Sequence, residues 1–197
     1  MNTEIKFAKT KPDAIIPSKR DEDMGFDIYA CFDEDYMVIQ THETKLIPTG
    51  IASVCNPNYG FLLRERGSTG SKGIALRCGV IDSGYRNEWF VGLTNATSRD
   101  VILSKLTLKE LIDKYKFEDE DGDICIPLNP TLTSSHENTL WIDNEPFYEP
   151  IIYPYSKAIA QALVVPVPKV IVDEISYKEL KAIESERGMG ALGSSNK

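Results

Sequence analysis

Short apolar runs broken by turn-forming residues recur along most of this 197-residue chain, and they limit what it can fold into. Runs such as Phe26–Ala30, Tyr59–Glu65 and Ile74–Ile81 are rich in Val, Ile, Tyr or Phe, and clusters of Gly, Pro, Asn or Asp separate them. Segments too short for ordinary helices, repeated at fairly regular intervals, are typical of β-strands joined by turns. The pattern predicts an all-β sandwich or barrel.

Composition and cysteine spacing exclude several other classes of protein. A hydrophobic content of 42% suits a soluble globular chain. No apolar run approaches the length of a membrane span, and the first residues lack the apolar core of a signal peptide. Cys31, Cys55, Cys78 and Cys125 are far apart in the sequence. We therefore expect reduced thiols in a cytoplasmic protein with no membrane partner.

Nearly all of the net charge of −8 belongs to one segment. Between Ala96 and Tyr155, twelve acidic residues stand against five basic ones, a net charge of −7. Because nucleic-acid binding needs a basic face, no direct contact with DNA or RNA is expected. Within this segment Thr107 and Glu110 have capping-box spacing ahead of a helical apolar pattern, which predicts a short helix. The segment is interpreted as an acidic, partly helical insertion.

Two turn regions have the residue types for phosphate chemistry. The loop "RERGSTGSKG" is rich in Gly and Ser and carries Arg64 and Arg66, so it can offer donors to phosphates, although an ordinary hairpin turn without a helix explains it equally well. In "GVIDSGYRNEWF", Asp82 follows an apolar run at the mouth of a turn, where a carboxylate can deprotonate a water. Tyr85 could offer its ring to a sugar or base. The alternative is an Asx turn capped by Asp82.

The chain ends in "RGMGALGSSNK", which lacks any apolar periodicity. One interpretation is a frayed tail, as at most chain termini. The other is a mobile arm whose backbone N–H groups wrap an anion while Arg187 anchors it. Just before this stretch, Ser176 and Glu179 form a second capping-box pair that predicts a helical turn.

In their order and spacing, "MGFDIYA", "RGSTGSK", "GVIDSGY", "IAQALVVP" and "RGMGALGSS" resemble the five motifs of the trimeric dUTPases. The resemblance extends from about Ile5 to Ser195, and the long acidic segment suggests a phage-type or prophage-type member. It implies a jelly-roll-like distorted β-barrel built from residues 1–95 and 156–186. Residues 96–155 would be an insertion between motifs three and four, and residues 187–197 a mobile arm over the active site. It also implies a homotrimer with active sites at the subunit contacts.

The resemblance implies hydrolysis of dUTP to dUMP and pyrophosphate with Mg²⁺, which limits uracil in DNA and supplies dUMP. Asp27 would orient a metal-bound water, and Asp82 would be the general base for attack on the α-phosphorus. Tyr85 would pack on deoxyribose, and the hairpin from Gly79 to Phe90 would read uracil through its main chain. The substrate-binding residues implied in this way are Arg66, Gly67, Ser68, Gly79, Val80, Ile81, Tyr85, Phe90, Gln161, Arg187, Leu192, Gly193 and Ser194.

The sequence departs from the family pattern at several of these motifs. The usual Arg-Ser-Gly of motif two is Arg-Gly-Ser here, motif three has lost a glycine, motif four has lost its charged pair, and the arm has lost its aromatic residue. We expect weaker closure of the arm and a higher KM with the chemistry retained. The departures are Gly67 and Ser68, Asn87, Ser156, Lys157 and Ala158, and Leu192.

Two other functions are considered. A dCTP deaminase of the same fold would need a catalytic glutamate where this chain has Gly92, so deamination is not favoured. An interaction protein with a weakened site could bind a basic partner, such as a phage repressor, through residues 96–155. Exposed aromatic residues there would serve such a partner, whereas the alternative is that they pack the insertion onto the barrel. They are Trp141, Phe147, Tyr148, Tyr153 and Tyr155.

Overall fold

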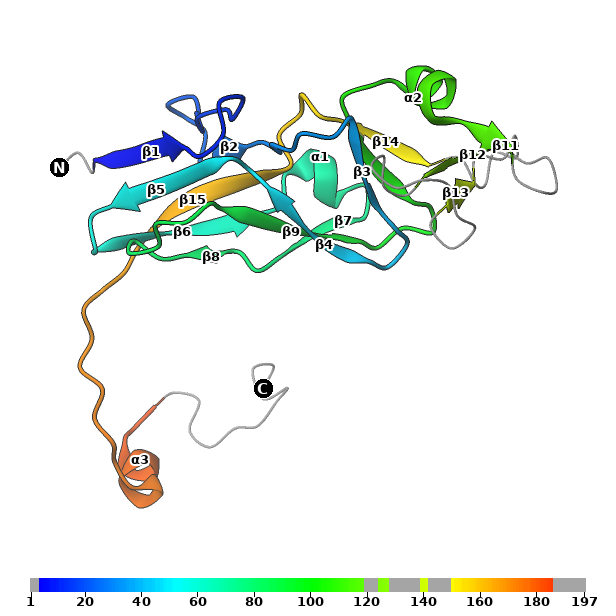
Figure 1. Ribbon diagram of the computed structural model, residues 1–197. Helices are drawn as coiled ribbons and strands as arrows, with labels where there is room; N and C mark the ends of the chain where they lie inside the picture. The colour runs from blue at the N-terminus through cyan, green and yellow to red at the C-terminus, as the bar shows by residue number, and fades with distance from the viewer. Residues whose placement is uncertain (1–3, 119–123, 128–138, 142–149, 186–197) are drawn as a thin grey trace. The chain divides into compact units, whose positions relative to one another are not determined.

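The computed structural model describes residues 4–118, 124–127, 139–141 and 150–185. The chain divides into two compact units, Met1–Val167 and Pro168–Lys197 (Figure 1). The strands are β1 (Ile5–Lys9), β2 (Phe26–Ile28), β3 (Tyr36–Ile39), β4 (Thr44–Pro48), β5 (Ile51–Cys55), β6 (Tyr59–Arg64), β7 (Ile74–Arg77), β8 (Val80–Ile81), β9 (Phe90–Asn95), β10 (Val101–Ser104), β11 (Phe117–Glu118), β12 (Ile124–Pro127), β13 (Thr139–Trp141), β14 (Ile151–Pro154) and β15 (Ala160–Pro166). The helices are α1 (Gly67–Gly70), α2 (Leu108–Tyr115) and α3 (Tyr177–Ala182).

The predicted all-β class is confirmed, because the apolar runs form strands. In the first unit the strands pair in the orders β2-β15-β6-β8, β4-β9-β7, β1-β5, β3-β10-β14 and β11-β12-β13. Most of these pairs are antiparallel, whereas β14 runs parallel to β10. Apart from β11-β12 and β12-β13, each of these pairs joins strands that at least one other strand separates in the sequence.

The core of the first unit lies between these sheets. Trp89 and Phe61 are fully buried, and their ring centroids are 4.8 Å apart in an edge-on arrangement. Phe7 from β1 adds a third ring, 5.7 Å from Trp89. Edge-on aromatic pairs at these separations add to the free energy gained by burying the rings. Residues of β1, β6 and the segment just before β9 are thereby locked together.

Both capping boxes predicted from the sequence are present. The Thr107 hydroxyl accepts from the backbone N–H of Glu110, whose carboxylate accepts from the backbone N–H of Thr107 over 2.8 Å, and α2 begins there. Ser176 and Glu179 make the same reciprocal pair at the start of α3 in the second unit. Each box satisfies two backbone donors that a helix start leaves unpaired.

The Gly- and Ser-rich loop contains one helical feature that the sequence did not indicate. Residues 67–70 form the single turn α1, where an ordinary turn without a helix was expected. The Thr69 hydroxyl explains this turn, because it accepts from the backbone N–H of Arg66 and donates to the carbonyl of Arg66. Thr69 is buried, so this local pair is shielded from water.

The start of the acidic segment is docked on the barrel through Asp35. Its carboxylate accepts from the Tyr115 hydroxyl over 2.8 Å and pairs with the Lys114 ammonium, and both contacts hold the pKa of Asp35 below its usual range. The hydroxyl of buried Tyr36 donates to the carbonyl of Pro127 in β12. Figure 1 shows α2 and the strands β11 to β13 gathered at the end of the unit where β3, β10 and β14 lie.

Of the two alternatives for the aromatic residues of the acidic segment, packing onto the barrel holds for Tyr153 and Tyr155. Tyr153 is 2% exposed, and its hydroxyl donates to the carbonyl of Ala158 over 2.8 Å. Tyr155 is partly buried, with its ring 4.9 Å from that of Phe32 and beneath the Lys105 ammonium. Packing against the core therefore accounts for these two rings. The side chains of Trp141, Phe147 and Tyr148 lie outside the described residues.

Among the described residues, no helix is long and apolar enough to cross a membrane. Cys31, Cys55 and Cys78 form no disulfide bond, and burial raises the pKa of both Cys31 and Cys55.

Candidate functional site

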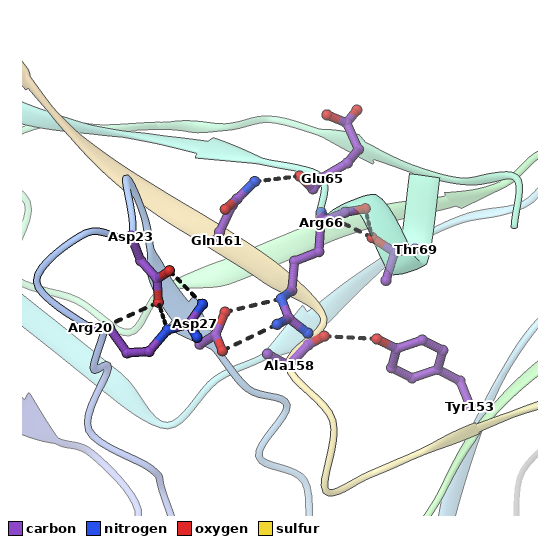
Figure 2. A network of polar contacts seen from close by, with 9 residues as sticks. All are labelled: Arg20, Asp23, Asp27, Glu65, Arg66, Thr69, Tyr153, Ala158 and Gln161. Carbon is purple, nitrogen blue, oxygen red and sulfur yellow. Dashed lines mark hydrogen bonds and ion pairs between the residues drawn. The ribbon is translucent and has the colours of Figure 1, made fainter. Parts of the chain in front are cut away.

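A polar cleft of about 530 Å³ opens where β2, β15 and the end of β6 meet. Three residues from distant parts of the sequence line it, namely Asp27, Arg66 and Gln161 (Figure 2). All three were predicted site residues. A hollow of this size is large enough for part of a nucleotide.

Strand pairing brings these residues together. In β15, Gln161 lies opposite Asp27 of β2 on one side and opposite Arg64 of β6 on the other. Arg66 follows two residues after Arg64, at the start of the loop that forms α1. Gly25 leaves room for this arrangement, since a Cβ there would lie 3.1 Å from the Gln161 side chain.

The cleft is held by paired polar groups. The Arg66 guanidinium lies 3.0 Å from Asp27 through Nε and 3.3 Å through Nη2, and each side chain is 33% exposed. Gln161 donates through Nε2 to the carbonyl of Glu65 over 2.8 Å. The Glu65 carboxylate in turn accepts from the backbone of Leu76 over 3.2 Å, and backbone hydrogen bonds lower its pKa. A cation, a carboxylate and an amide are thus positioned at one opening.

Sequence reasoning missed Tyr153, which supports this cleft from β14. Burial raises the pKa of Tyr153, while the nearby side chains of Ser68 and Arg66 act in the opposite direction. Tyr153, whose hydroxyl donates to the carbonyl of Ala158, therefore lies close to two predicted phosphate-binding residues. The apolar run before Pro154 was the available signal, because it indicates a buried strand.

The hairpin that follows β8 carries the other predicted residues. Asp82 comes directly after Ile81 and is exposed, and its carbonyl accepts from the backbone N–H of Tyr85 over 3.1 Å, which closes a turn. The Tyr85 hydroxyl donates to the carbonyl of Glu88 over 3.1 Å, and its ring is partly exposed. Val80 and Phe90 are also exposed. The hairpin therefore presents a carboxylate and apolar side chains to its surroundings.

Arg86 fixes the shape of this hairpin. Its guanidinium donates to the carbonyls of Ser83 and Tyr85 within the turn and, over 3.4 Å, to that of Ser53 in β5. Because these contacts join the turn to the sheet, the Asp82 and Tyr85 backbones are held in place.

Gly79 is required where β8 approaches β6. A Cβ at this position would lie 2.6 Å from the Leu63 carbonyl oxygen, and the Gly79 carbonyl accepts from the Leu63 backbone N–H over 2.6 Å. We expect Gly79→Ala to lower the free energy of unfolding by about 2 kcal/mol, since the strands must separate to admit a methyl group. Urea unfolding of the full chain measures this. Gly84→Ala in the same hairpin is the control, because nothing lies within 4 Å of its Cβ position. Equal stability of the two variants would contradict the prediction.

The two groups of residues lie at opposite ends of β6. Ile81 pairs with Phe61 near the beginning of this strand, so Asp82 lies beside its first residues. Gln161 pairs with Arg64 at the end of the strand, beyond which Arg66 lies. Phe61 and Arg64 are three residues apart, which corresponds to roughly 10 Å along the strand. One chain thus assembles Asp27, Arg66 and Gln161 in one place and the hairpin in another.

The arm residues Arg187, Leu192, Gly193 and Ser194 lie outside the described residues. Within the part that is described, Gly67 and Ser68 are exposed beside Arg66 on α1. A second hollow of about 620 Å³, between β10, β14 and the start of α2, contains none of the predicted site residues.

Among the described residues, no group of three or more His, Cys, Asp or Glu side chains could hold a metal ion by itself. Mg²⁺ is usually bound by one or two carboxylates together with substrate phosphates and waters, so the single carboxylate of Asp27 in a polar cleft is compatible with such a site. A metal would thus depend on substrate for most of its ligands.

Comparisons with known proteins agree on one family. Residues 11–107 match the model of the dUTPase family. The deoxyuridine 5'-triphosphate nucleotidohydrolase of Neisseria meningitidis serogroup B is 38% identical over 103 residues, which cover 50% of this chain and 68% of the relative. That of Buchnera aphidicola is 41% identical over 80 residues, which cover 39% of this chain and 51% of the relative.

Solved structures extend the likeness of the fold over nearly the whole chain. A mutant dUTPase of Staphylococcus bacteriophage 80alpha with dUpNHpp superposes with a TM-score of 0.64 at 20% identity and covers 98% of both chains. A mutant dUTPase from phage phi11 of S. aureus, described for the coordination of a structural Mg(II) ion, has a TM-score of 0.56 at 19% identity and covers 89% of this chain and 99% of its own.

The family match ends at residue 107, where the capping box of α2 begins. The matched part contains β2, α1 and the hairpin after β8, and therefore Asp27, Arg66 and Asp82. On these grounds the chain is a member of the dUTPase family.

Proposed function

We infer that this chain hydrolyses dUTP to dUMP and pyrophosphate. The observation that carries the inference is that the segment matched by the dUTPase model supplies both the Asp27–Arg66 pair of the cleft and the hairpin with Asp82. A cation and a carboxylate suit a polyphosphate with its metal, and an exposed carboxylate on a rigid turn suits activation of water. Removal of dUTP would limit uracil in DNA, and the reaction would supply dUMP.

In this proposal the hairpin binds the deoxyuridine part of the nucleotide and carries the general base. Asp82 takes a proton from the water that attacks the α-phosphorus. Tyr85 packs on deoxyribose and leaves no room for a 2′-hydroxyl. The main chain of Gly79, Val80 and Ile81 reads uracil, with Phe90 beside it, and steric exclusion rejects the methyl group of thymine.

The cleft binds the phosphates in the same proposal. Arg66, Ser68 and Gln161 offer donors, and Gly67 lets the backbone approach the anion. Asp27 would hold Mg²⁺ through a water, and the bound ion would neutralise charge on the triphosphate. Glu65 holds Gln161 and Asp27 holds Arg66, so little rearrangement is needed when charge develops.

The terminal arm and the assembly complete the proposal. Arg187, Gly193 and Ser194 would close on the γ-phosphate and Leu192 on the base, in an arm that opens to release products. The hairpin with Asp82 and the cleft lie at different ends of β6, which supports a homotrimer in which neighbouring subunits share each site. The barrel would consist of residues 1–95 and 156–186, the insertion of residues 96–155, and the arm of residues 187–197.

The acidic segment remains the proposed surface for a basic protein partner, and a cytoplasmic, phage-type setting remains a proposal as well. The partner proposal now depends on acidic charge more than on exposed rings, because Tyr153 and Tyr155 pack against the barrel.

Pyrophosphate release from dUTP tests the proposed function. We expect the full chain with Mg²⁺ to release pyrophosphate from dUTP and to leave dCTP and dTTP unchanged. Conversion of dCTP to dUTP would instead identify a deaminase. A folded chain that releases no pyrophosphate from dUTP would overturn the proposal.

A further inference from the structure

The loop before β2 forms part of the wall of the phosphate-binding cleft. The base of this loop is tied to the sheet, because the backbone N–H of Asp27 donates to the Ser18 carbonyl over 2.9 Å. Its position beside Asp27 is therefore set by strand pairing. The loop residues that line the cleft are Ser18, Lys19, Arg20, Asp23, Met24 and Gly25.

Arg20 makes a two-point ion pair within this loop. Its guanidinium donates to the Asp23 carboxylate through Nε over 2.9 Å and through Nη2 over 2.8 Å. Figure 2 shows the Arg20–Asp23 pair on one side of Asp27 and Arg66 on the other side. Hydrogen bonds from Arg20 hold the pKa of Asp23 at about 2, and the charges of Asp23 and Asp27 both raise the pKa of Arg20. Both partners are therefore charged at neutral pH.

A phosphate can replace Asp23 as the partner of Arg20, because the pair is exposed to water. The Arg20 side chain is 87% exposed, and water screens the attraction between exposed charges, so such pairs add little to stability. A phosphate offers more charge than a carboxylate and matches the planar guanidinium fork equally well. Asp23 would also keep one donor after an exchange, since the backbone N–H of Arg20 donates to it over 3.2 Å.

The two other cations of the cleft lining also have partners. The Lys19 ammonium donates to the carbonyls of Arg20 and Asp21 over 3.1 and 3.4 Å, and the Arg66 guanidinium is paired with Asp27. The cleft lining holds three cationic and two anionic side chains, so displacement of Asp23 from Arg20 would free one positive charge for a polyanion.

We propose that Arg20 is a further substrate-binding residue that exchanges Asp23 for the terminal phosphates of the nucleotide. Asp23 is then a competing anion, whose removal favours nucleotide binding. This inference rests on the proposed function and adds to it a residue outside the five family motifs.

The test is titration calorimetry of the full chain in Mg²⁺ with dUpNHpp, which keeps three phosphates, and with dUMP, which keeps one. We expect Arg20→Gln to weaken dUpNHpp binding about tenfold and dUMP binding less than about twofold, because only the longer ligand carries terminal phosphates. Asp23→Asn is expected to tighten dUpNHpp binding about threefold. Lys6→Gln is the matched control, since it removes an exposed, ion-paired cation from β1 outside the cleft lining.

Wild-type affinity for dUpNHpp in Arg20→Gln, or an equal loss of affinity for dUpNHpp and dUMP, would overturn the role of Arg20 while leaving dUTP hydrolysis intact. A tenfold loss in Lys6→Gln would do the same, because it would reveal a long-range charge effect. A wild-type chain that neither binds dUpNHpp nor hydrolyses dUTP would overturn the proposed function and this inference with it.

Discussion

Asp82→Asn is expected to lower the rate of dUTP hydrolysis by about 10³-fold, the order of effect when a general base is lost. An amide of the same shape keeps the turn that the Asp82 carbonyl closes with Tyr85, so the hairpin should survive. Pyrophosphate release at saturating dUTP measures the loss, and the Kd for dUpNHpp should change little.

Asp100→Asn is the control variant, because it removes a carboxylate outside the hairpin. Asp100 accepts from the backbone N–H and the hydroxyl of Thr41, far along the chain from the hairpin. The Asp100→Asn variant should hydrolyse dUTP at the wild-type rate. Retention of more than about a tenth of wild-type turnover by Asp82→Asn would contradict the role of Asp82 as the base.

Two inactive variants are expected to restore activity when mixed. Arg66→Gln should lower turnover about 10²-fold by removing a phosphate donor from the cleft, and Asp82→Asn is inactive through the hairpin. If each site takes the hairpin from one subunit and the cleft from another, random reassembly at equal amounts gives both intact parts in roughly a quarter of the sites. Co-refolding from urea followed by the pyrophosphate assay measures this recovery.

The double variant with both substitutions provides the control. Mixed with Asp82→Asn, it contributes no intact hairpin, so no activity should return. A mixture of the two single variants that stays as inactive as its parents would mean that subunits do not share sites, and a single chain would then have to bridge the length of β6 itself.

Local features of the fold were predictable from the sequence, whereas contacts between distant segments were not. The strand runs and the capping boxes at Thr107 and Ser176 depend on neighbours within a few residues, and both are confirmed. The turn α1 was missed, because it depends on a hydroxyl of Thr69 inside a glycine-rich run that otherwise favours an irregular turn. Burial of Tyr153 was one of two alternatives left by the sequence, because it depends on a sheet partner about fifty residues away.

The candidate site shows the same division. Asp82 and Tyr85 share one turn, and their spacing alone suggested a role. The meeting of Asp27 with Gln161 depends on the register of β15 with β2, which no local pattern specifies. Only the resemblance to a family placed them in one site, and that resemblance contained no reason to examine Arg20.

The parallel pairing of β10 with β14 has a consequence for the length of the acidic segment. Ile151 lies opposite Val101 and Pro154 opposite Ser104, so the chain that leaves β10 must travel back along the whole strand before β14 begins. A tight turn cannot make that return, since parallel neighbours need a crossover of about a dozen residues or more. A chain in which only a few residues joined Ser104 to Ile151 could therefore not pair these two strands in parallel. Shortening the acidic segment between β10 and β14 to a tight turn would then change the strand pairing, and not only trim a surface loop.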